Sequence, residues 1–395
     1  MKKILSLIIC LSLLLAGCAK PNTDETQTTP AITTQTTTEP TVILPQQEAM
    51  YAVSVPTISE SSRAEDGTVI FSYTHQSMML TLPDPDVANK VIIDFLSRID
   101  AGASNVDTLL AAAKANYNGA SDWTPYLYNL TYSPMRMDQS VLSLFGNCVT
   151  YSGASHPERV STSASYDLVT GDVLTLGSIM SAQATTEGFC DLVLEELGKV
   201  KEEKFLYDGY ENTVRQRFSM DESQDQDWYF STEGLCFYFV PYEIAPYSSG
   251  VIIAQIPYSK LTGLLYDGYF PAERETTSGT IQTTILDETD TTQFTQIAEL
   301  VLDPEGEMVF LHTSGIAWDV KIEYGAWNTS GAVFTPVYTA LYSSTLSPGD
   351  AIMIQSDELS ALRLSYFDGT ETVTQHFIHS EEGIQLVSDG VIQPL

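Results

Sequence analysis

Residues 230–265 read FSTEGLCFYFVPYEIAPYSSGVIIAQIPYSKLTGLL. Residues 235–240 form an aromatic, alternating run that predicts a strand, and Pro241 ends it because proline cannot donate to a sheet. Pro246 and the Ser-Ser-Gly that follows predict a loop, and residues 251–256 predict a second strand. Ser259 can then cap a short helix over 260–265. The stretch predicts strand, tyrosine-rich elbow, strand and helix, and it carries no catalytic motif.

The N-terminus predicts secretion and lipid anchoring. Lys2 and Lys3 precede an apolar run that is long enough for a signal peptide and too short for a membrane span. The sequence Leu-Ala-Gly-Cys at 15–18 resembles the lipobox of bacterial lipoproteins. That resemblance implies removal of residues 1–17 as a signal peptide and a diacylglycerol on Cys18; the alternative is an ordinary signal peptide with an incidental cysteine. We expect anchoring by lipid alone, on the extracytoplasmic face of the cell membrane.

Residues 18–50 are expected to form a tether. Between Ala19 and Glu48 there are ten threonines and four prolines and no aromatic residue, so this segment cannot bury enough apolar surface to fold. As a flexible coil it would span roughly 30 Å. Its expected role is to hold the folded part away from the membrane.

The charge balance is strongly acidic. The chain has 18 Lys and Arg against 51 Asp and Glu, a formal net charge of −33. Such a surface excludes nucleic acid as a partner and favours a basic one. The alternative interpretation is that the charge serves solubility alone.

The cysteines do not predict a disulfide framework. Beyond the signal and Cys18 the chain has Cys148, Cys190 and Cys236, an odd number with no Cys-x-x-Cys spacing. We expect all three to be small buried apolar residues rather than zinc ligands.

Residues 51–271 predict an α+β module of antiparallel sheet with a few helices. Asp86 is a candidate N-cap for a helix that begins at Val87, where apolar residues recur at a spacing of four. The expected helices span 87–99, 106–117 and 186–204, and the expected strands span 68–82, 126–132, 141–151 and 161–168.

Three motifs in this module resemble a known family. They are YSGASHP at 151–157, YDLVTGDVLTL at 166–176 and EGLCFYFVPYEIAPY at 233–247. Their order resembles the extracytoplasmic domain of the anti-sigma-V factor (RsiV) and the N-terminal module of certain Gram-positive peptidoglycan deacetylases. The resemblance covers about residues 65–270 and implies a module that binds protein or wall ligands, lysozyme in the anti-sigma member. The family loop reads Gly-Gly-Ala-His where this chain has Gly-Ala-Ser-His, and we expect no direct control of a sigma factor.

Six residues are candidates for partner binding: Tyr151, Gly153, His156, Tyr242, Glu243 and Tyr247. They come from the 151–157 loop and from the elbow, both of which are expected at strand ends, where binding groups are often placed. The hypothesis requires that these two stretches lie together, although about 85 residues separate them. The structural alternatives are that His156 bonds a backbone carbonyl and that Glu243 bonds backbone N–H groups of the bend. Tyr238, Tyr242, Tyr247 and Tyr258 could form an aromatic patch for a glycan or protein; the alternative is that half of these four are core residues.

Enzyme signatures are absent from the sequence. We find no nucleophile elbow, Ser-x-x-Lys, His-Glu-x-x-His, P-loop or dinucleotide fingerprint. His376 and His379 would lie on opposite faces of a strand, and the acidic run 221–227 lacks the glycine and glutamate of an EF-hand. We therefore expect no enzyme activity, no cofactor and no metal site.

The C-terminal part predicts a second architecture. Residues 272–284 are a plausible linker, and residues 285–395 carry eight short β runs without a helical stripe, which predicts a β-sandwich. Together these observations predict a surface lipoprotein that binds or senses a basic, lysozyme-like protein or a cell-wall glycan. A structural or accessory envelope protein is the alternative, and a wall-active hydrolase with an unrecognised site is a third.

Overall fold

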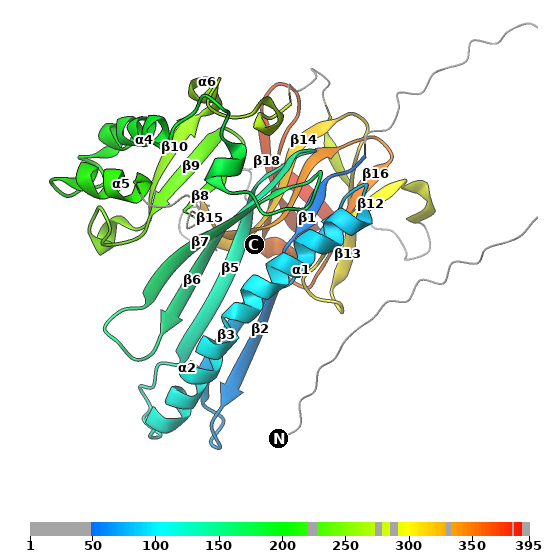
Figure 1. The fold of residues 1–395 in the computed structure, drawn as a ribbon. Helices are drawn as coiled ribbons and strands as arrows, with labels where there is room; N and C mark the ends of the chain where they lie inside the picture. Colours follow the sequence, from blue (N-terminus) through cyan, green and yellow to red (C-terminus); the bar gives the residue numbers. More distant parts are fainter. Residues whose placement is uncertain are drawn as a thin grey trace, which may run out of the picture. The chain divides into compact units, whose positions relative to one another are not determined.

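Residues 230–265 contain two strands of a three-stranded sheet, β9 (Gly234–Phe239) and β10 (Ile252–Pro257). With β8 (Trp228–Phe230) they pair in the order β10-β9-β8, all antiparallel (Figure 1). Every residue of β9 is buried because both faces of the sheet are covered. Its odd-numbered side chains join the core beneath α4, and Cys236 and Tyr238 pack toward Phe145 of the neighbouring sheet.

The structure, a computed structural model, describes residues 49–219, 227–272, 279–284, 291–328, 333–380 and 383–388. Contacts divide the chain into the units Met1–Gln46 and Gln47–Leu395, and all described residues belong to the second. The predicted signal, the lipidation site at Cys18 and the tether therefore lie outside the described residues, as does most of the acidic run. No helix among the described residues is long and apolar enough to cross a membrane.

Helices cover the outer face of the three-stranded sheet. They are α3 (Leu176–Ile179), α4 (Thr186–Val200), α5 (Tyr210–Phe218) and α6 (Tyr258–Leu261). The Thr185 hydroxyl caps α4 by accepting from Gly188 N, and the apolar face of α4 is buried in the core. Helix α5 was not predicted because its sequence is mostly polar and buries only Tyr210 and Val214.

A five-stranded sheet with helices on one face makes up the rest of the predicted α+β module. Its order is β2-β3-β5-β6-β7, formed by β2 (Thr57–Arg63), β3 (Val69–Gln76), β5 (Tyr126–Met137), β6 (Val141–Tyr151) and β7 (Glu158–Asp167). Helices α1 (Pro85–Ala101) and α2 (Ala103–Asn116) pack on it, and α1 runs along the sheet in Figure 1. Even-numbered side chains of β5, such as Tyr128 and Tyr132, are buried under these helices, so its odd-numbered side chains face the other way.

The C-terminal part is a β-sandwich, as predicted. Its strands are β11 (Ile281–Thr284), β12 (Gln296–Val301), β13 (Glu307–Thr313), β14 (Ala317–Asn328), β15 (Val333–Leu346), β16 (Asp350–Ser356), β17 (Leu362–Phe367), β18 (Thr372–Ser380) and β19 (Gly383–Ser388). The sheet β11-β13-β16-β12 and the sheet β19-β18-β17-β14-β15-β1-β4 share one apolar core. The fold class is therefore α+β with a β-rich C-terminal region. Strand β11 lies at the end of the segment predicted as a linker.

Two short strands connect the predicted modules. Strands β1 (Ala52–Ser54) and β4 (Met79–Thr81) belong to the seven-stranded sheet, with β1 between β15 and β4. The predicted boundaries at 271 and 285 stay a prediction, but strands from both sides of them share one sheet. Residues 68–82 are expected to form either a strand pair or one long bent strand; they form two strands, β3 and β4, which belong to two different sheets and do not pair with each other.

The start of α1 differs from the prediction. Asp84, rather than Asp86, is the N-cap, and its carboxylate accepts from the backbone N–H groups of Asp86 and Val87. Pro85 occupies the first helical position, where a missing N–H costs nothing and φ is already suitable. Similarly, α6 begins at Tyr258, two residues before the expected helix.

Candidate functional site

The loop at 151–157 and the elbow at 241–250 meet, as the binding hypothesis requires. The Tyr247 hydroxyl donates to the carbonyl oxygen of Pro157 over 2.9 Å. The His156 ring lies against the Tyr247 ring with centroids 4.7 Å apart, and His156 Nδ1 is 3.2 Å from the same Pro157 oxygen. The predicted structural alternative for His156, a contact with a backbone carbonyl, is thus observed, while the side chain remains exposed.

The elbow presents Tyr242 to solvent in a strained conformation. Tyr242 has φ +73°, in the left-handed region that bulky residues rarely adopt, and its side chain is 60% exposed. Its ring lies 5.6 Å from the ring of Tyr247. Because glycine would adopt this conformation without strain, the tyrosine is retained at a cost in folding stability.

Glu243 stabilises the elbow through hydrogen bonds to neighbouring residues of the protein. Its Oε2 accepts from Val240 N at 3.0 Å, and its Oε1 accepts from Arg217 Nη1 at 3.2 Å. Arg217 also pairs with Asp227 and lies over the Phe239 ring. Burial raises the pKa of Glu243, and the Arg217 charge opposes that shift. The expected alternative for Glu243, a bond to the backbone of the bend, is the arrangement observed.

A third segment, which the sequence did not reveal as part of the site, joins the elbow. The Tyr207 N–H donates to Ile244 O, and the Ser249 hydroxyl donates to Lys204 O, so residues 204–207 are fixed to the elbow. Phe205 has φ +55° and is 70% exposed; Tyr207 is 41% exposed. Phe205 occupies the left-handed position that glycine usually takes at a helix end, after α4. No glycine marks this turn, so no sequence signal was available.

We call the aromatic side chains of these three joined segments, His156, Phe205, Tyr207, Tyr242 and Tyr247, the aromatic surface. Ring contacts join His156, Tyr247 and Tyr242, and hydrogen bonds hold residues 204–207 to the elbow. Its two left-handed non-glycine residues, Phe205 and Tyr242, carry large and strongly exposed aromatic side chains. Strained backbone at exposed, bulky side chains is typical of functional positions, because nothing in the core requires it.

The other two predicted residues have local roles. Tyr151, at the end of β6, packs edge-on against Tyr126 with centroids 6.2 Å apart. Gly153 has φ +87°, and a Cβ there would lie 3.0 Å from the Tyr126 hydroxyl oxygen, so the turn requires glycine. Both residues therefore shape the loop that carries His156.

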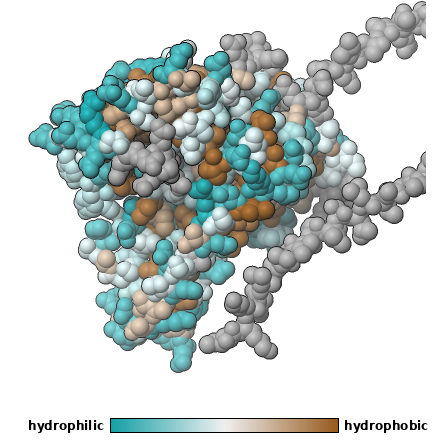
Figure 2. All heavy atoms as spheres, viewed as in Figure 1, coloured by the Kyte–Doolittle hydropathy of each residue, from teal (hydrophilic) through white to brown (hydrophobic). Residues whose placement is uncertain are grey.

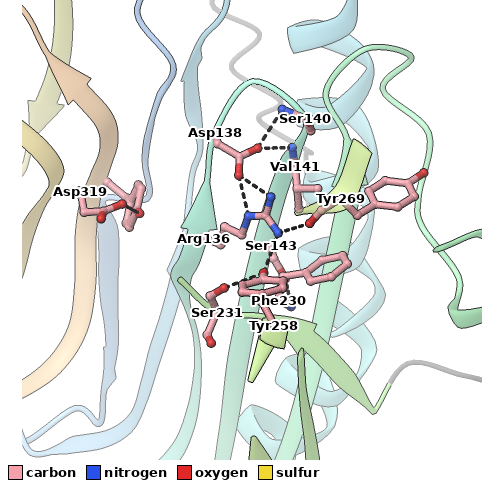
Figure 3. Close-up of polar contacts among 11 residues, drawn as sticks. Arg136, Asp138, Ser140, Val141, Ser143, Phe230, Ser231, Tyr258, Tyr269 and Asp319 are labelled. Atoms are coloured by element: carbon pink, nitrogen blue, oxygen red, sulfur yellow. Dashed lines mark hydrogen bonds and ion pairs between the residues drawn. The ribbon is translucent and has the colours of Figure 1, made fainter. Parts of the chain in front are cut away.

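A buried charge network joins β5 to the segments around β8 and after β10 (Figure 3). Arg136 is 1% exposed; its Nε donates to Asp138 at 2.6 Å, and its Nη1 donates to Tyr258 Oη and Tyr269 O, each at 2.6 Å. Tyr258 in turn donates to Ser231 O. The network links β5 to the segment that follows β10, and every contact in it is structural.

The candidate metal ligands of the described residues lie apart from one another. Among the described residues, no group of three or more His, Cys, Asp or Glu side chains could hold a metal ion. His376 is buried beside the Trp327 ring, and the side chain of His379 is not among those described. The three cysteines are free thiols, two of them buried.

Two grooves lie elsewhere on the molecule. One, of about 470 Å³, has Glu233, Asp319 and Lys321 in its wall. The other, of about 320 Å³, lies between the five-stranded sheet and the sandwich. Figure 2 shows that the face in view is largely hydrophilic, with hydrophobic residues in small separate patches.

The fold and the aromatic surface define an α+β protein with a β-sandwich and an exposed contact surface. Comparison with known proteins finds a similar family, for which no activity is given. Residues 184–259 match the family model described as "Protein of unknown function (DUF3298)", so this part of the chain, the DUF3298 segment, is similar to the members of that family. It contains the elbow and the 204–207 segment but not His156. The match identifies no catalytic family.

Solved structures of DUF3298 family proteins are similar to the chain at low identity. A member from Bacteroides fragilis NCTC 9343 is 16% identical, with a TM-score of 0.41, over 56% of this chain and 95% of that one. A family protein from Pseudomonas aeruginosa PAO1 is 14% identical, with a TM-score of 0.36, over 56% and 97%. A search of curated proteins found no match.

Proposed function

We propose that this chain is a lipid-anchored extracytoplasmic protein that binds a basic protein partner through the aromatic surface. The observation that carries the proposal is the pairing of strain and exposure at Phe205 and Tyr242. Exposed aromatic side chains on a rigid support are the groups that most often dominate binding at protein interfaces.

The hydrogen bonds that hold the aromatic surface in place favour a role in binding. Tyr247 is held by Pro157, residues 204–207 are held by the elbow, and Glu243 is held by Arg217. A surface that is ordered before binding loses less conformational entropy when the partner docks.

Charge favours a basic partner. The chain carries a net charge of −33, and exposed carboxylates at Glu158, Glu202 and Asp208 lie near the aromatic residues in the sequence. Arg159 and Lys201 lie beside them and Lys204 pairs with Glu203, so the net charge of the whole chain carries this argument. Electrostatic complementarity of this kind accelerates association and weakens with salt.

The finer family resemblance supports the same proposal. The motif at 233–247, which is similar to the anti-sigma-V and deacetylase modules, lies inside the matched DUF3298 segment and forms the elbow. A lysozyme-like protein is therefore the first partner to test. A structural role in the envelope is the alternative, and it predicts no ligand at this surface.

The test measures whether the chain binds lysozyme and whether the aromatic surface is the binding site. Lysozyme is titrated into the full chain at low and high salt, with Phe205→Ala, Tyr242→Ala and, as a matched control, Tyr266→Ala, a tyrosine 50% exposed outside this surface. We expect each surface variant to weaken binding by about 2 kcal/mol and the control to leave it unchanged. Equal affinity in all variants would place the interface elsewhere.

Lipid anchoring is tested separately. Cys18→Ser should release the protein from the membrane fraction, because the proposed anchor is the acylated cysteine alone. Retention of the variant in that fraction would contradict the anchor without bearing on the aromatic surface.

A further inference from the structure

We infer that the groove of about 320 Å³ is a second binding site, one for a saccharide that carries hydroxyl and amino groups. This inference goes beyond the proposed function and does not depend on the aromatic surface. We call this site the sheet groove; its wall consists of Thr57, Ser59, Thr74, Asn129, Thr131, Leu302, Tyr324, Val337, Tyr338, Ser356, Asp357 and Glu358.

The floor of the sheet groove is a polar row across three neighbouring strands. Ser59 of β2 pairs with Thr74 of β3, and Thr74 pairs with Asn129 of β5, so the three side chains lie side by side on the sheet. The Ser59 and Thr74 hydroxyl oxygens are 3.3 Å apart. This face is opposite to the one buried under α1, and a sheet face of hydroxyls and an amide provides donors and acceptors at regular spacing.

The wall supplied by the sandwich combines aromatic rings with carboxylates. Tyr324 of β14 and Tyr338 of β15 lie with ring centroids 5.6 Å apart. The Tyr324 hydroxyl donates to Glu358 Oε2 at 3.0 Å, and Glu358 N donates to the Ser356 hydroxyl, which fixes the acidic turn. No described residue bonds the Asp357 carboxylate, so it is available to a ligand.

The composition of the wall selects the class of ligand. Ligand pockets are mostly lined by apolar groups; this one, at the lower end of the usual range of roughly 300–1000 Å³, exposes polar and apolar surface about equally, and eight of its twelve wall residues carry a hydroxyl, amide or carboxylate side chain besides the two tyrosines. Its ligand must therefore bring many hydrogen-bonding groups. The wall holds two carboxylates and no Lys, Arg or His, which excludes an anion and favours a cationic group. A sugar ring also has an apolar C–H face that can pack on Tyr324.

Two buried polar atoms in the wall, Thr57 Oγ1 and Asn129 Oδ1, have no hydrogen bond to any described residue. A buried polar atom without such a bond is unfavourable in a folded protein. The larger groove of about 470 Å³ carries no such inference, because Ala272 in its wall adjoins residues outside the described part of the chain.

The experiment uses two matched ligands, chitotetraose and its fully N-acetylated form, titrated into the full chain by calorimetry at mildly acidic pH. We expect both to bind, with chitotetraose about tenfold tighter at low salt, because its charged amines meet Asp357 and Glu358. Glu358→Gln combined with Asp357→Asn should remove that preference and leave the affinity for the N-acetylated ligand.

Variants then locate the site. Tyr324→Ala should weaken both ligands at least about tenfold, and Tyr266→Ala should weaken neither. Phe205→Ala and Tyr242→Ala should not affect saccharide binding, so failure of the proposed function and failure of this inference are distinguishable. The inference is overturned if neither ligand binds at millimolar concentration, if Tyr324→Ala binds as wild type does, or if tetralysine binds where both saccharides fail.

Discussion

The Tyr247 hydroxyl donates a 2.9 Å hydrogen bond to the carbonyl oxygen of Pro157, across 90 residues of sequence. This bond joins the elbow to the 151–157 loop and fixes the position of His156. It is one of the direct polar links between the DUF3298 segment and the hairpin of the five-stranded sheet.

Tyr247→Phe should therefore destabilise the protein modestly. The variant keeps the ring contacts with His156 and Tyr242 and loses one hydrogen bond, which costs about 1 kcal/mol. Denaturant unfolding measures the change. Tyr207→Phe is the control, since no described residue bonds its hydroxyl, and an equal loss in both variants would show that the Pro157 bond contributes nothing specific.

Phe205→Gly and Tyr242→Gly should each stabilise the fold. Glycine removes the left-handed strain of a bulky residue, and after its greater unfolded-state entropy is subtracted the gain is roughly 0.5–1 kcal/mol. Phe205→Ala removes the side chain but keeps the backbone strain, so it distinguishes the effect of the strain on stability from the effect of losing the ring. Denaturant unfolding measures the stability of all three variants. Under the proposed function all of these variants bind the partner more weakly, so higher stability accompanies lower affinity in the glycine variants.

Glu243→Gln should gain stability relative to wild type as pH rises. Burial raises the pKa of Glu243 in the folded protein above its unfolded value, so the folded state holds its proton to higher pH. Wild type thus loses stability as pH rises between those two values, whereas the amide of the variant does not titrate. We therefore expect the difference in Tm between the variant and wild type to increase as pH rises from below the pKa of Glu243 in the unfolded state to neutral pH. A difference in Tm that stays constant over this range would contradict a raised pKa in the folded protein.

Arg136→Met should be strongly destabilising. It leaves Asp138 without its cation and Tyr258 and the Tyr269 carbonyl without their donor in a buried site, a loss of about 3–5 kcal/mol. Arg215→Met removes an ion pair with Asp191 that is about half exposed on both sides, and should cost less than about 1 kcal/mol. Unfolding free energies of the two variants test this contrast.

The cysteines should be slow to react in the folded protein. Burial raises the pKa of Cys236 to about 11 and also raises the pKa of Cys148 and Cys190, so little thiolate is present at about pH 8. In Cys18→Ser protein without its signal peptide, a thiol reagent should label three sites only after denaturation. Reductant should leave Tm nearly unchanged, whereas a drop of more than roughly 8 °C would indicate a disulfide.

The sequence predicted those parts of the fold that depend on local pattern. The β runs of the C-terminal region and the apolar stripe of α1 depend on side-chain periodicity, which is written along the chain. The meeting of the 151–157 loop with the elbow was also expected, from the family resemblance and the position of both at strand ends. Asp84 was overlooked as a cap because two aspartates, each next to Pro85, compete for that role.

The remaining features depend on contacts between distant residues. A left-handed Phe205 has no sequence signal, since glycine normally marks such a turn, and α5 has too few apolar residues to show a stripe. The sheet groove combines β2, β3 and β5 with residues of β14, β15 and β16, an arrangement that no single stretch reveals.

Strand β1 has a consequence for the order of folding during synthesis. Ala52 pairs with Ser343, so the first strand of the folded unit lacks its inner neighbour until nearly the whole chain has been made. Contacts this distant in sequence form slowly. A chain that emerges from its N-terminus would therefore carry β1, paired with β4 alone, with its other edge open while the DUF3298 segment is already complete. Such an edge is a site for chaperone binding or aggregation, and it disappears only when β15 arrives.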